Sequence, residues 1–254
     1  MNITRNEEYQ FFSVGTKICN CYVVTYKDKA VMFDTGPLSE RATIEANLQK
    51  DFIFDLDAIF LTHSHGDSAG NAEYFSMLFN CPVYCIKTAV DLVSRGRVVI
   101  PPKSHPYMKK VGNAARLMLK LPSFIPYEAC QNVKPLTSSV VEELLGKKAQ
   151  LLMTPGHTDD SVSFAFENVA IIGDCAQFKK RVLAPIFVND ENQLATTWES
   201  LLRLGCKYYL SSHGRPFDAD EWLHQKVDSS ILEQDADDAI DINDQQDSED
   251  TDKA

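Results

Sequence analysis

Long apolar runs are absent from this chain of 254 residues, and no stretch approaches the roughly 18 consecutive apolar residues that a membrane-spanning helix needs. The first eight residues also lack the apolar core of a secretion signal. The seven cysteines are an odd number, and most of them lie in apolar stretches, where a reduced thiol behaves as a small hydrophobe. These features argue against a disulfide-stapled secreted protein and predict a cytoplasmic protein without a membrane span.

Aromatic residues are absent from the C-terminal segment 228–254, which holds 11 acids and one lysine. A segment of this composition cannot bury enough surface to become ordered. The rest of the chain is nearly neutral, so the tail carries most of the formal net charge of −11. We predict one domain over residues 1–227 and a disordered acidic tail at 228–254. A tail that only solvates the domain and a tail that competes with an anionic ligand both fit this composition.

Acidic residues are absent from the segment 95–127, which is interrupted by prolines and carries basic residues at positions 95, 97, 103, 109, 110, 116 and 120. A short helix is predicted within it at 108–121. One interpretation is a solvated surface insertion that pairs loosely with the acidic tail. The other is a lid that attracts an anionic substrate. Such a lid would turn an apolar face to the substrate or to a membrane surface, formed by Val111, Ala115, Met118 and Leu119.

The two halves of the chain show a similar order of strands and helices. In the first half, strands are expected at 10–14, 19–26, 30–34, 58–61 and 82–86. Helices are expected from Ser39, a fair N-cap, to about Lys50, and from near Ala69, with Ser68 as its cap. In the second half, strands are expected at 149–153, 162–166, 169–173 and 208–211, and helices at about 196–204 and 219–227. This layout predicts an α/β fold in which two sheets pack face to face and helices cover them outside.

Histidine is scarce, with six in the chain, yet four of the six lie in polar loops beside glycine that follow predicted strands. The loop after the strand 58–61 contains His63, His65 and Asp67 at alternate positions. Alternate side chains of an extended segment point the same way, so the two histidines can meet one cation while Asp67 reaches beside them. This spacing predicts a metal site.

Three later strands are followed by similar clusters, which are the segment 154–161 around His157, Gly173-Asp174-Cys175, and the segment 211–214 around His213. A further cluster, Asp34-Thr35-Gly36, follows the third predicted strand. In their order along the chain these clusters resemble the five motifs of the metallo-β-lactamase superfamily, and the resemblance covers residues from about 10 to 217.

The resemblance implies a four-layer αββα sandwich with metal ions in a cleft at one edge of its two sheets. It assigns a first metal site to His63, His65 and His157. It assigns a second site to Asp67, Asp174 and His213, with Asp174 as the carboxylate that bridges the metals. Asp34 matches the acid that braces these loops from behind the ligands. The alternatives are that Asp34 only caps a turn and that His213 is a partly buried neutral histidine.

Ser68 departs from the family pattern, because the larger hydrolase branch has a further histidine there. A serine hydroxyl is a poor zinc ligand, so the second site is short of one ligand. One branch of the lactamases uses a cysteine from the loop in which Cys175 lies. Asp174 and Cys175 are neighbours near a strand end and should point to opposite faces, and we favour Asp174 as the ligand. Cys175 would then be a small buried hydrophobe.

Three histidines with an open fourth position are typical of a catalytic zinc, which supplies hydroxide at neutral pH. The main hypothesis is therefore a hydrolase that holds one or two zinc ions, with iron as a possible metal. Asp67 would orient the nucleophile or take its proton. The expected substrate is a small molecule with an ester, thioester or lactone bond, because a lactamase that acts outside the cell normally carries a signal peptide.

Two other functions remain open. A phosphodiesterase is favoured by the basic segment 95–127, in which Lys109, Lys110 and Arg116 could hold a phosphate. A member that binds a ligand without catalysis is suggested by Ser68, since it weakens the second metal site. Nucleic acid is not an expected partner, because no part of the chain is long enough for the additional domain of the nuclease branch. The sequence makes no prediction about the oligomeric state.

Overall fold

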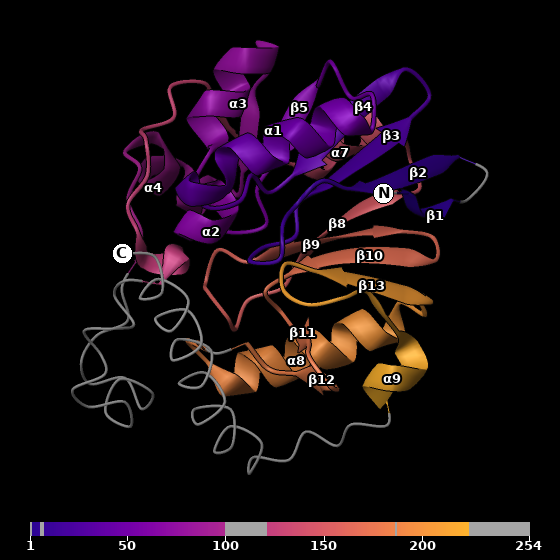
Figure 1. The fold of residues 1–254 in the computed structure, drawn as a ribbon. Helices are drawn as coiled ribbons and strands as arrows, with labels where there is room; N and C mark the ends of the chain where they lie inside the picture. Colours follow the sequence, from indigo (N-terminus) through magenta and orange to yellow (C-terminus); the bar gives the residue numbers. More distant parts are fainter. Residues whose placement is uncertain (1, 6–7, 100–120, 186, 224–254) are drawn as a thin grey trace, which may run out of the picture.

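The computed structural model describes residues 2–5, 8–99, 121–185 and 187–223 (Figure 1). The acidic tail predicted at 228–254 therefore lies outside the described residues, as does the middle of the basic segment, residues 100–120. The apolar lid face predicted around Val111 to Leu119 lies outside them too. Within the part of the chain that the structure describes, no helix combines the length and apolar character needed to cross a membrane.

The first sheet has seven strands that follow each other in chain order, β1 to β7. Its antiparallel part is made of β1 (Asn2–Arg5), β2 (Tyr9–Ser13), β3 (Tyr22–Tyr26) and β4 (Lys29–Phe33). Its parallel part continues with β5 (Ala58–Phe60), β6 (Val83–Cys85) and β7 (Val133–Pro135). Parallel neighbours need crossover connections, and α1 (Arg41–Lys50) and α3 (Ala72–Phe79) lie in two of them. The carboxyl ends of β4, β5 and β6 therefore meet at one edge of the sheet.

The second sheet has five strands in the order β14-β13-β10-β9-β8. These strands are β8 (Ala149–Met153), β9 (Val162–Phe166), β10 (Val169–Gly173), β13 (Tyr208–Ser211) and β14 (Phe217–Asp218). Four of the five match the predicted bounds, and β14 was not predicted. β10 and β13 are parallel, and α8 (Glu191–Arg203) lies in the connection between them. A hairpin of β11 (Gln177–Phe178) and β12 (Val182–Leu183) forms a small separate sheet.

Aromatic side chains fill the space between the two sheets. Phe33 of β4 packs edge to face on Phe164 of β9 with ring centroids 4.8 Å apart, and Phe60 of β5 stacks on the same ring at 5.6 Å. All three rings are completely buried. Burial of a side chain of this size stabilises the fold by roughly 1.5–3 kcal/mol, so this layer holds the two sheets together.

Helices cover the outer faces of both sheets (Figure 1). Ile44 and Leu48 of α1 are buried against the first sheet. Trp198 of α8 and Trp222 of α9 (Ala219–Leu223) pack on the second sheet, with ring centroids 5.4 Å apart. The predicted four-layer αββα sandwich is confirmed.

The helix starts predicted at Ser39 and at about Thr196 are wrong. Ser39 does not cap α1, because it lies inside the short 3-10 turn η1 (Leu38–Glu40) that leads into the helix at Arg41. α8 begins at Glu191, five residues before the predicted start. The side chain of Asp190 accepts a hydrogen bond of 3.0 Å from the backbone N–H of Gln193 and caps this helix.

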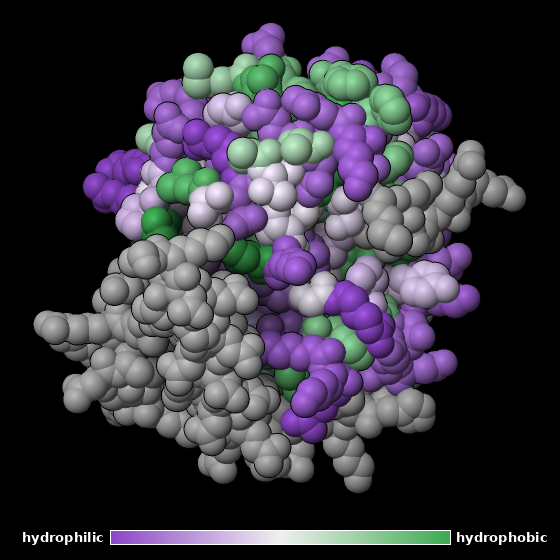
Figure 2. Space-filling model, viewed as in Figure 1, coloured by the Kyte–Doolittle hydropathy of each residue, from purple (hydrophilic) through white to green (hydrophobic). Residues whose placement is uncertain are grey.

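Among the described residues between the halves, one strand and two α-helices were not predicted. They are β7, the helix α4 (Val90–Ser94) and the helix α7 (Ser138–Leu145). Thr137 caps α7 through a hydrogen bond from the N–H of Val140. Met77 of α3 is 71% exposed, and apolar side chains gather at the top of Figure 2, on the side of the molecule where Figure 1 shows α1 and α3.

Candidate metal centre

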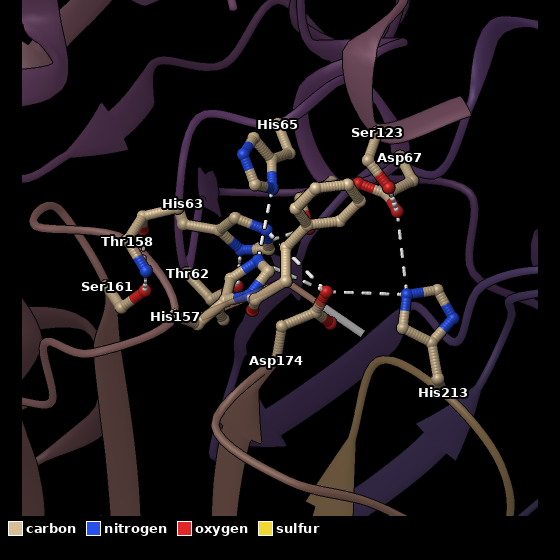
Figure 3. A network of polar contacts seen from close by, with 12 residues as sticks. Thr62, His63, His65, Asp67, Ser123, His157, Thr158, Ser161, Asp174 and His213 are labelled. Atoms are coloured by element: carbon tan, nitrogen blue, oxygen red, sulfur yellow. Dashed lines mark hydrogen bonds and ion pairs between the residues drawn. The ribbon is translucent and has the colours of Figure 1, made fainter. Parts of the chain in front are cut away.

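The six predicted ligands come together at one edge of the sandwich (Figure 3). Each follows a strand. His63 and His65 follow β5, and Asp67 lies in the short helix α2 (Gly66–Ala69) directly after them. The other three follow strands of the second sheet, namely His157 after β8, Asp174 after β10 and His213 after β13. Since the ends of these strands meet at one edge, residues 150 positions apart become neighbours.

The first group consists of His63, His65 and His157, and all three side chains are buried. One ring nitrogen from each lies within 4.8 Å of the others. Nε2 of His157 is 3.1 Å from Nδ1 of His65. Three nitrogens converging in this way form three corners of a site for one cation.

The nitrogens on the far side of two of these rings have other partners. Nδ1 of His157 donates a hydrogen bond of 2.6 Å to the carbonyl of Phe187. Nδ1 of His63 lies 3.0 Å from Oγ1 of Thr62 and 3.3 Å from Oγ of Ser68. A hydrogen bond at one nitrogen fixes the tautomer and leaves the lone pair of the other nitrogen free for a metal.

Burial favours the neutral form of two of these imidazoles. It lowers the pKa of His65 to about 3, and the neighbouring rings of His157 and His63 act in the same direction. Burial also lowers the pKa of His157, although Asp174 opposes it. Because only a neutral imidazole binds a metal, His65 and His157 are prepared to act as ligands at neutral pH.

The second group consists of Asp67, Asp174 and His213. Nε2 of His213 is 3.5 Å from Oδ2 of Asp67 and 3.4 Å from Oδ2 of Asp174. The same oxygen of Asp174 is 3.5 Å from Nε2 of His157 and 3.9 Å from Nε2 of His63. Asp174 therefore stands between the two groups, the place expected of a bridging carboxylate.

The charges of the second group stabilise each other. Burial opposes the charged form of His213, but Asp174 and then Asp67 outweigh it and raise the pKa of His213 well above its usual value. Burial likewise opposes the charged form of Asp67, yet the hydrogen bond from His213, together with the charges of His213 and His65, outweighs it and lowers the pKa of Asp67 to about 2. Two carboxylates around one imidazolium make a group that attracts positive charge.

Buried polar atoms at the centre support a metal in both groups. Nε2 of His63, Oδ1 of Asp67 and Oδ1 of Asp174 are buried and have no hydrogen-bond partner. Such atoms are rare in native proteins and call for a reason. Imidazole nitrogens and carboxylate oxygens suit zinc and iron. The residues present therefore fit one or two such ions.

Asp34 lies behind the first group. Its Oδ1 accepts a hydrogen bond of 2.8 Å from the backbone N–H of Thr62, and its Oδ2 accepts one of 2.8 Å from Oγ1 of the same residue. Thr62 in turn contacts Nδ1 of His63. Burial raises the pKa of Asp34 to about 7, against the opposing effects of His63 and Thr62. Asp34 is thus linked through Thr62 to the candidate ligand His63 and supports it from behind.

Ser68 and Cys175 both face away from the second group. Ser68 was expected to cap a helix, but it lies inside α2, and α3 starts only after Asn71. Its hydroxyl is instead directed at Nδ1 of His63. The thiol of Cys175 contacts the carbonyl of Thr154 at 3.6 Å in a buried apolar cluster. Asp174 and Cys175 diverge as expected, and burial raises the pKa of the Cys175 thiol to about 11.

Two residues that support the centre were not predicted. Asn71 donates from Nδ2 to the carbonyls of Thr35, Gly36 and Pro37, so it fastens the loop after β4 to the metal loop. In the sequence, the one signal for Asn71 was its place at the end of the motif that follows β5. Ser123 donates a hydrogen bond of 2.5 Å to Oδ2 of Asp67. It belongs to a distant segment, and no pattern in the sequence connects it to the motif.

A known family and several known proteins are similar to this chain in sequence or in fold. The family described as the Metallo-beta-lactamase superfamily matches residues 14–213 of the chain. A probable metallo-hydrolase of Methanocaldococcus jannaschii is 28% identical over 155 residues. This match covers 61% of the present chain and 66% of the relative, slightly less than two thirds of the relative's length.

Solved structures share the fold at low sequence identity. An archaeal metallo-beta-lactamase superfamily protein from Sulfolobus tokodaii has a TM-score of 0.63 and 18% identity, covering 87% of this chain and 85% of that one. A protein solved in a di-iron-bound form has a TM-score of 0.61 and 20% identity, covering 85% of this chain and 98% of that one. These similarities concern the fold.

Proposed function

The chain belongs to the metallo-beta-lactamase superfamily, and from this premise we propose that it is a metal-dependent hydrolase of a small ester, thioester or lactone. The first group carries the proposal. Its three buried imidazoles each turn one nitrogen toward one point, and the far nitrogens of His157 and His63 are held in hydrogen bonds. That arrangement provides three ligands and leaves a further position for water or substrate, which is typical of a catalytic site.

The ligand set suits zinc, with iron as the alternative. His63, His65 and His157 would hold a zinc ion, which would act as a Lewis acid and would lower the pKa of a bound water to about 7. Asp67, Asp174 and His213 would hold a second ion, with Asp174 shared between the two. The di-iron form of a structural neighbour keeps iron open for this chain.

Asp67 has a catalytic role in this proposal. A pKa of about 2 makes its carboxylate a weak base at neutral pH. We therefore favour a role in orienting the attacking nucleophile over a role in taking its proton. His213, 29% exposed at the side chain, lies where the second group opens to solvent and to an entering substrate.

The phosphodiesterase alternative, the domain bounds and the location remain predictions from the sequence. The phosphodiesterase alternative depends on Lys109, Lys110 and Arg116, which lie outside the described residues. The domain at 1–227 with its acidic tail, and the cytoplasmic location, are part of the proposal. Support for the location comes from the seven cysteines, which are all free and buried.

The test combines metal content with a panel of substrates. The full chain is produced with zinc and iron in the medium, and its metal content is measured by mass spectrometry. Hydrolysis is then assayed on a carboxylic ester, a thioester, a lactone and a phosphodiester. We expect one or two metal ions per chain and activity on a member of the first three classes.

Variants separate the outcomes of this test. His157→Ala should lose metal and at least about a hundredfold in hydrolysis, since even the loss of a residue behind a ligand costs 10–100-fold. Cys175→Ser is the matched control and should keep both. Metal content and hydrolysis that survive His157→Ala would contradict the assignment. A wild-type chain without metal would favour a binding protein, and activity on the phosphodiester alone would favour the alternative enzyme.

A further inference from the structure

A short strap crosses the loop that carries His65 and Asp67. The strap is the segment 121–127, the described end of the basic segment, and it contains the 3-10 turn η4 (Pro122–Phe124). Phe124 is buried, and its ring centroid lies 5.3 Å from that of His65. The hydroxyl of Tyr127 donates a hydrogen bond of 3.0 Å to the carbonyl of Ser64. This end of the basic segment therefore packs on the metal loop and is not a solvated insertion.

The metal loop is shaped to admit the strap. A Cβ atom at Gly66 would lie 2.5 Å from the carbonyl oxygen of Pro122 and 2.4 Å from that of Ile125. Both contacts are with backbone, so a larger residue would push the strap away. The glycine between His65 and Asp67 thus allows a backbone from a distant part of the chain to approach the site.

Ser123 is the polar contact between the strap and the ligands. Its hydroxyl donates to Oδ2 of Asp67 at 2.5 Å (Figure 3). The same oxygen lies 3.5 Å from Nε2 of His213. A carboxylate on a flexible side chain can rotate, and a hydrogen bond to one oxygen fixes that rotation. Residues that hold a ligand in this way raise metal affinity without touching the metal.

We propose that Ser123 is a positioning residue for the second metal, and that it holds Asp67 in the orientation that binds this ion. Ser68, the neighbour of Asp67 in the chain, is directed at His63 and adds no ligand to the second group. With three ligands in the second group, the affinity for the ion depends on how well each ligand is oriented. The strap supplies that orientation from 56 residues away. This inference rests on the proposed metal-dependent function.

Metal titration of the full chain tests the inference without an activity assay. The chain is stripped with a chelator and titrated with zinc by calorimetry, and the two binding steps are compared. In Ser123→Ala we expect the weaker step to lose about 10–100-fold in affinity, while the tighter step changes little. Ser123→Thr keeps a hydroxyl and should restore the weaker step. Ser94→Ala removes a serine hydroxyl that donates to the carbonyl of Asp91 in its own helix, and it should change neither step.

The outcomes distinguish this inference from the proposed function. Wild-type chain that binds no zinc would overturn both. Wild-type chain that binds zinc in one step would overturn the role of Ser123, because no second ion would exist to be held. Equal affinities in wild type and Ser123→Ala would overturn it as well. An equal loss in both steps, without rescue by threonine, would reduce Ser123 to a structural residue of the strap.

Discussion

The two halves of the candidate metal centre are built in different ways. The first group has three buried imidazoles, and the far nitrogens of His157 and His63 are held by the carbonyl of Phe187 and the hydroxyl of Thr62. The second group has two carboxylates and one histidine, and its supports are remote. His213 is held by the carbonyl of Ile18, and Asp67 is held by Ser123. The first group is therefore prepared before a metal arrives, whereas the second depends on distant segments being in place.

Loss of a ligand should have the largest effect and should separate the groups. His65→Ala leaves two nitrogens in the first group, and we expect its metal affinity to fall at least about a hundredfold. His213→Ala should abolish the weaker binding step and leave the tighter one nearly intact. Zinc titration of both variants measures this difference. Variants that weaken both steps equally would show that the groups act as a single site.

Removal of the brace behind the first group should have an intermediate effect. Asp34→Asn keeps an oxygen for the N–H of Thr62 and tolerates the positive φ of 58° at this position. The amide nitrogen of this asparagine replaces Oδ2 and cannot accept the hydrogen bond from Oγ1 of Thr62. We expect the tighter metal step to weaken about tenfold. An effect confined to the weaker step would contradict the link from Asp34 through Thr62 to His63.

Acid should destabilise the stripped chain partly through the first group. Burial lowers the folded pKa of His65 from 6.5 to about 3, so the unfolded chain binds more protons between these values. The stability that His65 contributes is present above about pH 6.5 and is lost as the pH falls toward 3. The folded pKa of Asp34 is raised to about 7, so the stability that Asp34 contributes increases as the pH falls. Asp34 is present both in wild type and in the variant with which it is compared.

The comparison that isolates this contribution is between wild type and His65→Phe. The melting temperature of the stripped wild type should fall more on acidification from pH 7 to pH 4 than that of the variant. His213 has a raised pKa, so its contribution is present below about pH 6.5 and is lost as the pH rises. Parallel curves for wild type and variant would show that His65 does not titrate in this way.

The smallest effect is expected for Ser68. Its hydroxyl lies 3.3 Å from Nδ1 of His63, which is a weak contact beside that of Thr62. Ser68→Ala should change the tighter metal step by less than about tenfold, the lower limit for a residue behind a ligand. It should not change the weaker step. A large loss in the weaker step would make Ser68 a ligand of the second metal.

The sequence predicts well where its periodicity and spacing are strong. The strands of the second half alternate with clear turns, and four of them occur at the predicted bounds. The polar clusters were identified because each follows a predicted strand, and the resemblance to the metallo-β-lactamase superfamily assigned the six candidate ligands within them. The order of the loops along the chain carried the rest of the assignment to the family.

Contacts between distant segments were beyond such reasoning. Ser123 and Asp67 are 56 residues apart, and neither residue type at either position indicates the other. Ser39 and Ser68 look like helix caps, but neighbouring backbone turns start the helices differently. Local propensity ranks the residues that fit a helix start, while packing in the fold decides which of them is used.

Stepwise zinc binding to the stripped full chain tests the central claim most directly. We expect two zinc-binding steps, with the first at least about tenfold tighter because its ligands are already fixed. The tight step should disappear in His157→Ala and the weak step in His213→Ala. Two equal steps, or a chain that binds no zinc and no iron, would contradict the account.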